Sequence, residues 1–347
     1  GCADALLFID HYIANSLSAK NHVSILSIDF EKAFDRIGAH VILSKLKSWG
    51  IGPKMFNFIK SFLANRKFRI RINKTYSRVF ELHNGVPQGS PLSVILFSIA
   101  FSEISNIISR NNNVKHCLYA DDLYILCKKN DNSQTITIFN DILKNLNDWA
   151  DSAGAKISIN KTKILHICKK YSCTFYSHNI FFNNVKIDLV TNLKILGVIF
   201  QKNYTWKIHC KNLKNTITAR VNFINFLASR KCLVHINALI YLTKTLILSK
   251  IDYGLFIYGR SPKTTLNIIK TPYHQAVRSS LFAYRTTPIK HLLVEAGLPE
   301  IPNRVYQIQA ALVTKLVTRK TRFLKTLSQQ YLKGKGVPEY CQRFMKP

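Results

Sequence analysis

Acidic residues are scarce in this chain of 347 residues, which has 18 Asp and Glu against 50 Lys and Arg and a formal net charge of +32. Such a charge attracts polyanions over long range, and it would be a liability for a protein that met only neutral ligands. Nucleic acid is the first partner that the composition predicts, and an anionic membrane surface is the second. Because 47% of the residues are hydrophobic, the chain can form real cores and is not a disordered basic tail.

Long hydrophobic runs are also missing. No uninterrupted apolar stretch reaches the roughly 18 residues that a spanning helix needs, and the start lacks the pattern of a cleaved secretory signal. We therefore expect an intracellular protein that has no membrane partner. The chain begins at Gly1 rather than at a methionine, which predicts a protein that is incomplete at its N-terminus.

Paired cysteines are absent too, since the eight cysteines fall at irregular spacings and none forms a C-x-x-C pair. This argues against both a disulfide framework and a zinc ribbon, and we expect buried free thiols. A loose cluster of His166, Cys168, Cys173 and His178 matches no common zinc finger. Ordinary packing is the favoured interpretation of that cluster, and metal binding is the alternative.

The periodicity of apolar residues divides the chain into an α+β part and a helical part, with a boundary near 205. In the first part we expect strands at 24–30, 114–118, 123–127, 156–159, 163–168 and within 193–200, and helices at 3–19, 39–49, 53–63, 92–110 and 135–153. In the second part we expect helices at 207–228, 235–250, 263–283 and 303–329. The predicted domains are 1–205, 206–330 and a weakly ordered tail, 331–347.

A basic hairpin is predicted where Lys67, Arg69 and Arg71 alternate with apolar residues and residues 77–82 return antiparallel to them. Two interpretations stay open for its charged face. One is a solvated edge strand that uses charge to prevent aggregation, and the other is a surface that contacts phosphates.

Two adjacent carboxylates, Asp121 and Asp122, lie between two short apolar runs at the tip of a second predicted hairpin. The chain has enough lysine and arginine to neutralise both carboxylates, so two adjacent acids without a neighbouring cation in the sequence indicate a functional role. Binding metal ions against a polyanion is the natural candidate. Adjacent strand residues point to opposite faces, and we expect the two acids to differ in their surroundings.

Three segments in order carry a family resemblance: 27–35 (SIDFEKAFD), 85–92 (GVPQGSPL) and 119–122 (YADD). They are similar to the A, B and C motifs of reverse transcriptases, and most similar to those of non-LTR retrotransposons of the LINE type, which are jockey-like. The resemblance is dense over residues 1–205. It implies a right-hand polymerase whose palm is an antiparallel sheet with packed helices, followed by a mainly helical thumb and connection, with most of the fingers missing.

The resemblance also implies a set of site residues. Asp29 and Asp121 would bridge two Mg²⁺ ions, for which Mn²⁺ could substitute, while Asp122 assists and the backbone carbonyl of Phe30 adds a ligand. The nucleotide site would comprise Phe34, Gln88, Gly89 and Lys161. Leu196 and Gly197 stand where the family has its primer-grip strand, and Asp35 matches an acid of structural role.

The predicted function is that of an RNA-directed DNA polymerase acting on an RNA template, a DNA primer and deoxynucleoside triphosphates, in the nucleus and cytoplasm by family resemblance. Its protein partners are unknown. Two alternatives remain open: a catalytically silent relic that binds nucleic acid, because an incomplete chain could be inactive alone, and an RNA-dependent RNA polymerase. The last fits less well, since Phe34 should obstruct ribonucleotides.

Overall fold

The computed structural model describes residues 1–318 except 112, 130, 169–174, 176–179, 184, 230, 231 and 233. The chain forms two compact units. Residues Ala19–Leu193 make one, which we call the sheet unit, and residues Gly1–Ser18 together with Lys194–Pro347 make the other, which we call the helical unit. The predicted palm and thumb limits stay predictions, and the tail at 331–347 lies outside the described residues.

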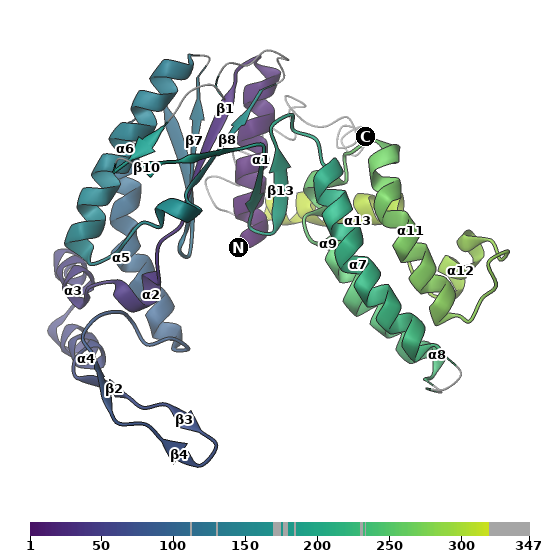
Figure 1. The fold of residues 1–347 in the computed structure, drawn as a ribbon, viewed down its shortest axis with the longest axis horizontal. Helices are drawn as coiled ribbons and strands as arrows, with labels where there is room; N and C mark the ends of the chain where they lie inside the picture. Colours follow the sequence, from purple (N-terminus) through teal and green to yellow (C-terminus); the bar gives the residue numbers. More distant parts are fainter. Residues whose placement is uncertain are drawn as a thin grey trace. The chain divides into compact units, whose positions relative to one another are not determined.

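A five-stranded sheet in the order β11-β8-β1-β7-β6 organises the sheet unit (Figure 1). Its strands are β1 Val23–Ile28, β6 Val114–Tyr119, β7 Asp122–Lys128, β8 Lys163–Ile167 and β11 Asp188–Val190. Strand β1 is central and pairs antiparallel with both β7 and β8, which explains why its apolar residues are all buried. The expected antiparallel sheet is confirmed for these pairs, while β11 runs parallel to β8.

The four helices predicted in this unit are confirmed, with ends that shift by no more than three residues. They are α3 Ala39–Ser48, α4 Pro53–Leu63, α5 Pro91–Ser109 and α6 Asn132–Ala153, and a short helix that was not predicted, α2 Ala33–Arg36, precedes them. The Asp131 side chain caps α6 by accepting from the Ser133 backbone N–H, and Gly154 ends the helix at φ 72°. A separate two-stranded sheet of this unit pairs β9 Phe181–Phe182 with β10 Val185–Lys186.

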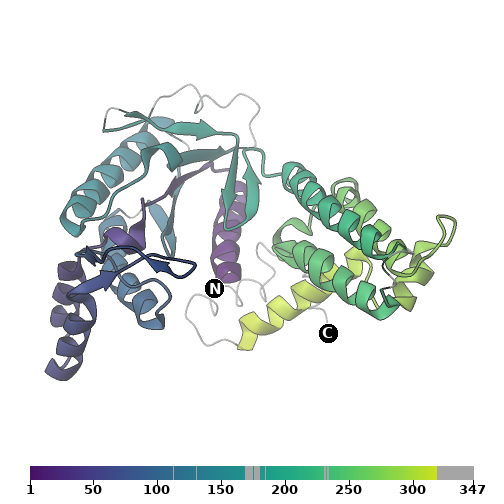
Figure 2. The same cartoon turned by 60° about the horizontal axis from the view of Figure 1, so that its bottom comes forward.

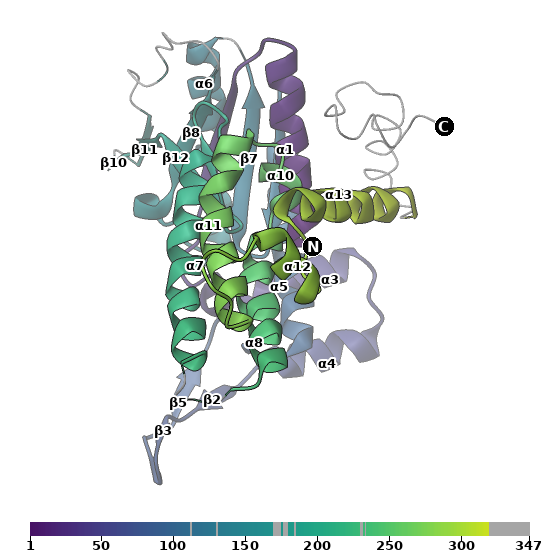
Figure 3. The same ribbon diagram turned by 90° about the vertical axis from the view of Figure 1, so that its right-hand side faces the viewer.

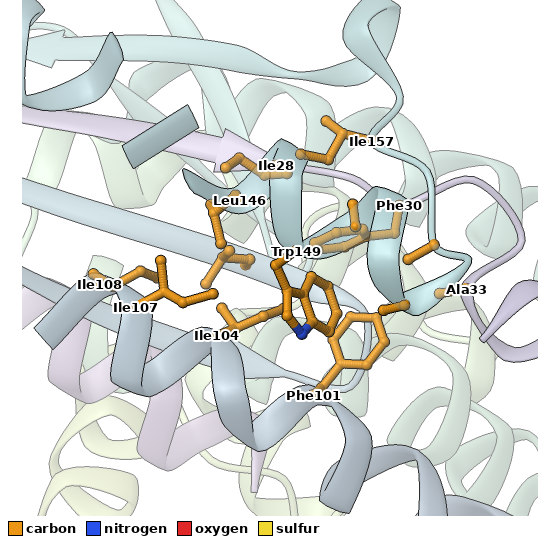
Figure 4. Packing of buried hydrophobic residues seen from close by; sticks show 14 of the residues in the cluster. Ile28, Phe30, Ala33, Phe101, Ile104, Ile107, Ile108, Leu146, Trp149 and Ile157 are labelled. Carbon is orange, nitrogen blue, oxygen red and sulfur yellow. The ribbon is translucent and has the colours of Figure 1, made fainter. Parts of the chain in front are cut away.

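The core of the sheet unit lies between the sheet and the helices α5 and α6. Phe30, Phe101 and Trp149 form edge-to-face aromatic contacts there, and Figure 4 shows them packed with Ile104 and Leu146. All five side chains are at least nine-tenths buried. Since Phe30 directly follows Asp29, this packing fixes the end of β1 at which the carboxylate stands.

Helix α5 is long and apolar enough to span a membrane by length and composition, and it is the one such helix among the described residues. Eight of its residues, including Phe97, Phe101 and Ile104, are buried within the sheet unit. A helix that packs into a core needs an apolar face of this kind, so its packing explains the apolar character of these eight positions.

The strand predicted at 156–159 is wrong. Ile157 makes only an isolated bridge to Phe30, and a 3₁₀ turn follows at Ile159–Lys161. The buried Thr162 causes the turn, because both its backbone N–H and its hydroxyl donate to the Ser158 carbonyl. Because of these local bonds the chain turns after Ile157, and strand pairing does not continue beyond that single bridged residue.

The predicted basic hairpin is present as two short ladders: β2 Arg66–Phe68 with β5 Phe80–Leu82, and β3 Arg71–Ile72 with β4 Thr75–Tyr76. We call residues 66–82 the arm. Figure 1 shows β3 and β4 projecting beyond α4, and Figure 2 shows the same ribbon from a second direction. Large apolar side chains are exposed along it, among them Ile72 at 69%.

The helical unit contains α1 Cys2–Ser18 and the elements after residue 194. The helices among them are α7 Lys207–Leu227, α8 Ile236–Leu242, a π-helical turn Thr243–Leu248, α9 Ser249–Asp252, α10 Leu255–Tyr258, α11 Lys263–Ser280, α12 Ile289–Glu295 and α13 Ile301–Thr318. The predicted helices are confirmed, although the one expected at 235–250 is interrupted by the π turn. The remainder of the one expected at 303–329 lies outside the described residues. Figure 3 shows α7 and α11 side by side.

A buried ionic group explains why α1 belongs with residues from the other end of the sequence. Asp10 accepts hydrogen bonds from the Tyr204 hydroxyl at 2.6 Å and from Arg260 at 2.5 Å. Burial, and then the charge of Asp10, raise the pKa of Tyr204 well above its ordinary value, which keeps the hydroxyl protonated as a donor. Loss of either Asp10 or Arg260 would leave the other's buried charge uncompensated.

Candidate active site

Two strand ends bring the predicted carboxylates together. The last pair of the β1–β7 ladder is Ile28 with Leu123, so that Asp29 and Asp122 are the next residues at the same edge of the sheet. Tyr119 pairs with Asp122, which leaves Ala120 and Asp121 as a two-residue turn. Ala120 has a φ of 52°, a conformation that costs a residue with a side chain about 1–2 kcal/mol. The turn thus holds Asp121 beside the other two acids.

The two neighbouring aspartates differ as predicted, because Asp121 is exposed and Asp122 is half-buried. Burial raises the pKa of Asp122, and the charges of Asp121 and Asp29 raise it further, while a hydrogen bond with Tyr124 opposes them. The charges of Asp121 and Asp29 therefore both repel that of Asp122. A cation bound among them would remove that repulsion.

Residues 156–161 lie along the end of β1 and bring Lys161 to it. The Ser158 backbone N–H donates to the Asp29 carbonyl at 2.8 Å, and the Glu31 N–H donates to the Lys156 carbonyl at 2.8 Å. At the turn that follows, Lys161 Nζ is 3.7 Å from Asp29 Oδ1, and both side chains are exposed by a third or more. An exposed pair of this kind contributes little stability, so the ammonium is available to another anion.

The loop at residues 84–90 is fixed against the segment that follows Asp29. The Gly85 backbone N–H donates to the Ile37 carbonyl, and the Val86 N–H donates to the Phe34 carbonyl, both at 2.8 Å. A Cβ at Gly85 would lie 2.6 Å from the Asp35 carbonyl oxygen, and its φ is +83°. Glycine is therefore required at position 85 for both space and conformation.

Predicted nucleotide-site residues meet around this loop. Gln88 Nε2 donates to Asp35 Oδ1 at 2.8 Å, which agrees with the structural role expected for Asp35. The half-buried Phe34 ring stacks on Phe97 at 4.0 Å. Gly89, at φ +91°, has nothing within 4 Å of the place where a Cβ would stand, so the backbone there is open to a close approach.

Arg66 is a functional candidate that the sequence reasoning missed. Its guanidinium donates to the Asn84 and Gly85 carbonyls at 2.5 and 2.8 Å, and its Nε donates to the Leu63 carbonyl at 3.3 Å. Burial lowers its pKa, and the charge of Asp35 opposes that shift. Arg66 thereby joins the end of α4 to the start of the loop that carries Gln88. No sequence pattern distinguishes it from the other arginines nearby.

The arm carries the three predicted nucleic-acid contacts on exposed positions. Arg69 lies over the Tyr76 ring at 4.2 Å, and Arg71 lies 5.6 Å from the same ring. Lys67 forms an ion pair with Glu81 across the ladder at 3.1 Å, and this pair neutralises part of the positive charge of the arm. Tyr76, another residue that the sequence reasoning did not single out, orders both arginines through cation–π contacts.

The predicted primer-grip residues form a tight turn between β12, Asn192–Ile195, and β13, Val198–Gln201. Leu196 and Gly197 both have positive φ, at 43° and 87°, as a two-residue type I′ hairpin turn requires. The Tyr253 hydroxyl donates to the Leu196 carbonyl at 2.6 Å. This third residue missed from the sequence anchors the turn within the helical unit.

Comparison with known proteins places these observations in a family. The model described as "Reverse transcriptase (RNA-dependent DNA polymerase)" matches residues 4–200. The RNA-directed DNA polymerase from mobile element jockey of Drosophila funebris is 23% identical over 318 residues, which cover 89% of this chain and 34% of that protein.

A probable RNA-directed DNA polymerase from transposon BS of Drosophila melanogaster is 25% identical over 77% of this chain and 30% of that protein. The chain spans about a third of the length of these curated relatives. Among solved structures, apo telomerase from Candida tropicalis is similar at 13% identity over 93% of this chain and 55% of that chain, with a TM-score of 0.43. The family model covers more than half of the sequence, from α1 to β13, and the resemblance of the three motifs to LINE-type enzymes is confirmed by the relatives. This chain belongs to the reverse transcriptase family.

Proposed function

We propose that this chain supplies the palm, residues 1–205, and the thumb and connection, residues 206–330, of an RNA-directed DNA polymerase from a non-LTR retrotransposon. It extends a DNA 3′ end on an RNA template with deoxynucleoside triphosphates. The observation that carries the proposal is the gathering of Asp29, Asp121 and Asp122 at one edge of a sheet in a chain whose net charge is +32.

The donor set at this edge fits Mg²⁺. Hard divalent cations prefer oxygen ligands, and the three side chains that converge here are all carboxylates. Burial, and then the charges of Asp121 and Asp29, raise the pKa of Asp122, and a bound cation would relieve the repulsion among these charges. When bound, two Mg²⁺ ions, or Mn²⁺ in their place, would activate the primer hydroxyl and stabilise the departing pyrophosphate.

The backbone of Phe30 supports its proposed part in this site. Since the Asp29 carbonyl and the Glu31 N–H both bond to residues 156–158, the alternation of a β ladder turns the Phe30 carbonyl to the opposite side, toward β7. Asp121 and Asp122 stand at the end of β7. Asp29 and Asp121 would hold the ions, with Asp122 and the Phe30 carbonyl assisting.

The nucleotide would lie between the carboxylates and the loop at 84–90. Lys161, whose ammonium is largely exposed beside Asp29, is suited to a triphosphate. Gln88 is oriented by Asp35, and the open backbone at Gly89 allows close approach. Phe34, supported from behind by Phe97, would crowd the sugar 2′ position and so favour deoxynucleotides.

Primer extension on an RNA template with Mg²⁺ tests the proposal. We expect deoxynucleotide incorporation by the wild-type chain and its loss in Asp121→Asn, with Asp148→Asn, an exposed acid on α6, as the matched control. Salt-dependent binding without incorporation would support a silent nucleic-acid-binding relic instead. Selective ribonucleotide incorporation would support an RNA polymerase, and either result would overturn the proposal.

A further inference from the structure

A second group of metal-ligand side chains lies at the other end of β1. The β1–β8 ladder pairs Val23 with Ile167 and Ser24 with His166, so one step further His22 stands opposite Cys168. Side chains alternate along strands, and His22, Ser24, His166 and Cys168 therefore project from one face of the sheet. Asp29 is a strand length away, on the order of 20 Å at about 3.3 Å per residue.

The spacing of the donor atoms is that of a metal site. One ligand atom each of His22, His166 and Cys168 lies within 4.8 Å of the other two. Cys168 Sγ is 3.5 Å from His22 Nε2. In a tetrahedral zinc site with Zn–N of about 2.0 Å and Zn–S of about 2.3 Å, the two ligand atoms are about 3.5 Å apart. The His22–Cys168 pair already has this separation.

The surroundings of His166 prepare one of its nitrogens to bind a metal. Its Nδ1 is 2.8 Å from Ser24 Oγ, so Nε2 would be the ligand atom, and the Phe175 ring stacks on the imidazole at 4.1 Å. A ligating histidine usually donates its second ring N–H to an oxygen that fixes the tautomer and the ring orientation.

We propose that His22, His166 and Cys168 bind one zinc ion that joins the start of β1 to the end of β8. Two imidazoles and one thiolate are the ligands that zinc prefers, whereas Mg²⁺ requires oxygen. Water or an exogenous ligand takes the fourth position. The ion would stabilise the folded sheet unit by an amount that grows with the logarithm of its affinity. Cys173 and His178, which the sequence grouped with this cluster, lie outside the described residues.

Cobalt titration of the metal-stripped full chain tests this proposal without measuring polymerase activity. Co²⁺ bound by a thiolate gives a sulfur-to-metal charge-transfer absorption, and a tetrahedral site gives intense visible bands. We expect both to saturate at one equivalent, to disappear on adding Zn²⁺, and to be lost in Cys168→Ser. Cys117→Ser, which removes another half-buried thiol, should retain them. Ions at the carboxylate edge give no sulfur charge transfer.

Alkylation of the wild-type chain provides the second measurement, which does not depend on the folding of the Cys168→Ser variant. With iodoacetamide and peptide mass spectrometry, we expect Zn²⁺ to slow the modification of Cys168 at least about tenfold, since a bound thiolate is shielded, and to leave Cys117 unchanged. Absence of a thiolate–cobalt band at one equivalent, its persistence in Cys168→Ser, or an unchanged alkylation rate at Cys168 would each overturn the zinc site.

Discussion

The carboxylate edge and the arm both present charged side chains, but they are positioned in different ways. At the edge, Asp29 and Asp122 continue two paired strands whose apolar residues are buried. In the arm, Arg69 and Arg71 are ordered by the exposed ring of Tyr76. The core of the sheet unit therefore sets the geometry of the edge, whereas local contacts set that of the arm. Chemistry that needs fixed distances is expected at the first, and adaptable binding at the second.

The largest expected effect is loss of catalysis at the edge. Asp29→Asn should lower primer extension by at least about 1,000-fold, because a metal ligand contributes several kcal/mol to transition-state stabilisation. Glu31→Gln is the matched control, since Glu31 pairs with Lys156. Steady-state incorporation rates measure both variants, and equal losses would show that the edge has no special role.

The second-largest expected effect is a difference in stability between alanine substitutions at two glycines of the loop at 84–90. Gly85→Ala should destabilise the fold by about 3 kcal/mol, since its Cβ would overlap the Asp35 backbone at a positive φ. Gly89→Ala has the same backbone strain but open space, and should cost about 1 kcal/mol. Denaturant midpoints compare the two variants. Similar losses would contradict the close packing at Gly85.

The arm should affect binding rather than folding. Arg69→Ala should reduce the slope of log affinity against log salt by about 0.7 to 0.9, the loss of one phosphate contact. Lys144→Ala removes the same charge from an exposed position on α6 and should leave the slope nearly unchanged. Fluorescence anisotropy with a primer–template duplex measures both slopes. The edge-strand interpretation of the arm predicts no difference between them.

Tyr253→Phe should weaken the helical unit by about 1 kcal/mol, the usual contribution of one hydrogen bond, here to the Leu196 carbonyl. Tyr241→Phe, at a position 65% exposed, is the control. Thermal unfolding distinguishes the two. If the turn takes part in primer positioning, Tyr253→Phe should also raise the apparent KM for primer–template more than it lowers kcat.

The smallest effect concerns pH. The pKa of Asp122 is raised in the folded chain, chiefly by burial and then by Asp121 and Asp29, so its ionised form opposes folding above the unfolded pKa. Lowering the pH through the raised pKa relieves that cost. Without divalent ions, Asp122→Asn should therefore raise stability at pH 7, by less than about 1 kcal/mol, and give no gain well below pH 3.8. A gain independent of pH would contradict this cause.

The sequence predicted most of the fold because its signals are local. Apolar periodicity located the strands on either side of Asp121 and the helix that carries Trp149, and it separated the helices expected at 39–49 and 53–63, which are α3 and α4. The strand expected at 156–159 failed because a Thr162 side chain competed for the backbone. Secondary-structure propensities of single residues do not include a hydrogen bond of this kind.

The site divides in the same way. Asp29, Asp121 and Asp122 were found through motifs whose spacing is visible in the sequence. Arg66, Tyr76 and Tyr253 were missed because each acts through a contact with a backbone carbonyl or a side chain that only folding brings near. The His22 ligand was likewise invisible, since the strand register alone places it beside residues 166 and 168.

Binding of Mn²⁺ measured by electron paramagnetic resonance tests the central claim most directly, namely that the three carboxylates form one cation site. We predict that the full chain and Asp148→Asn bind Mn²⁺ equally, and that Asp121→Asn binds it at least about tenfold more weakly through the loss of one charged ligand. Equal binding by all three proteins would contradict the account.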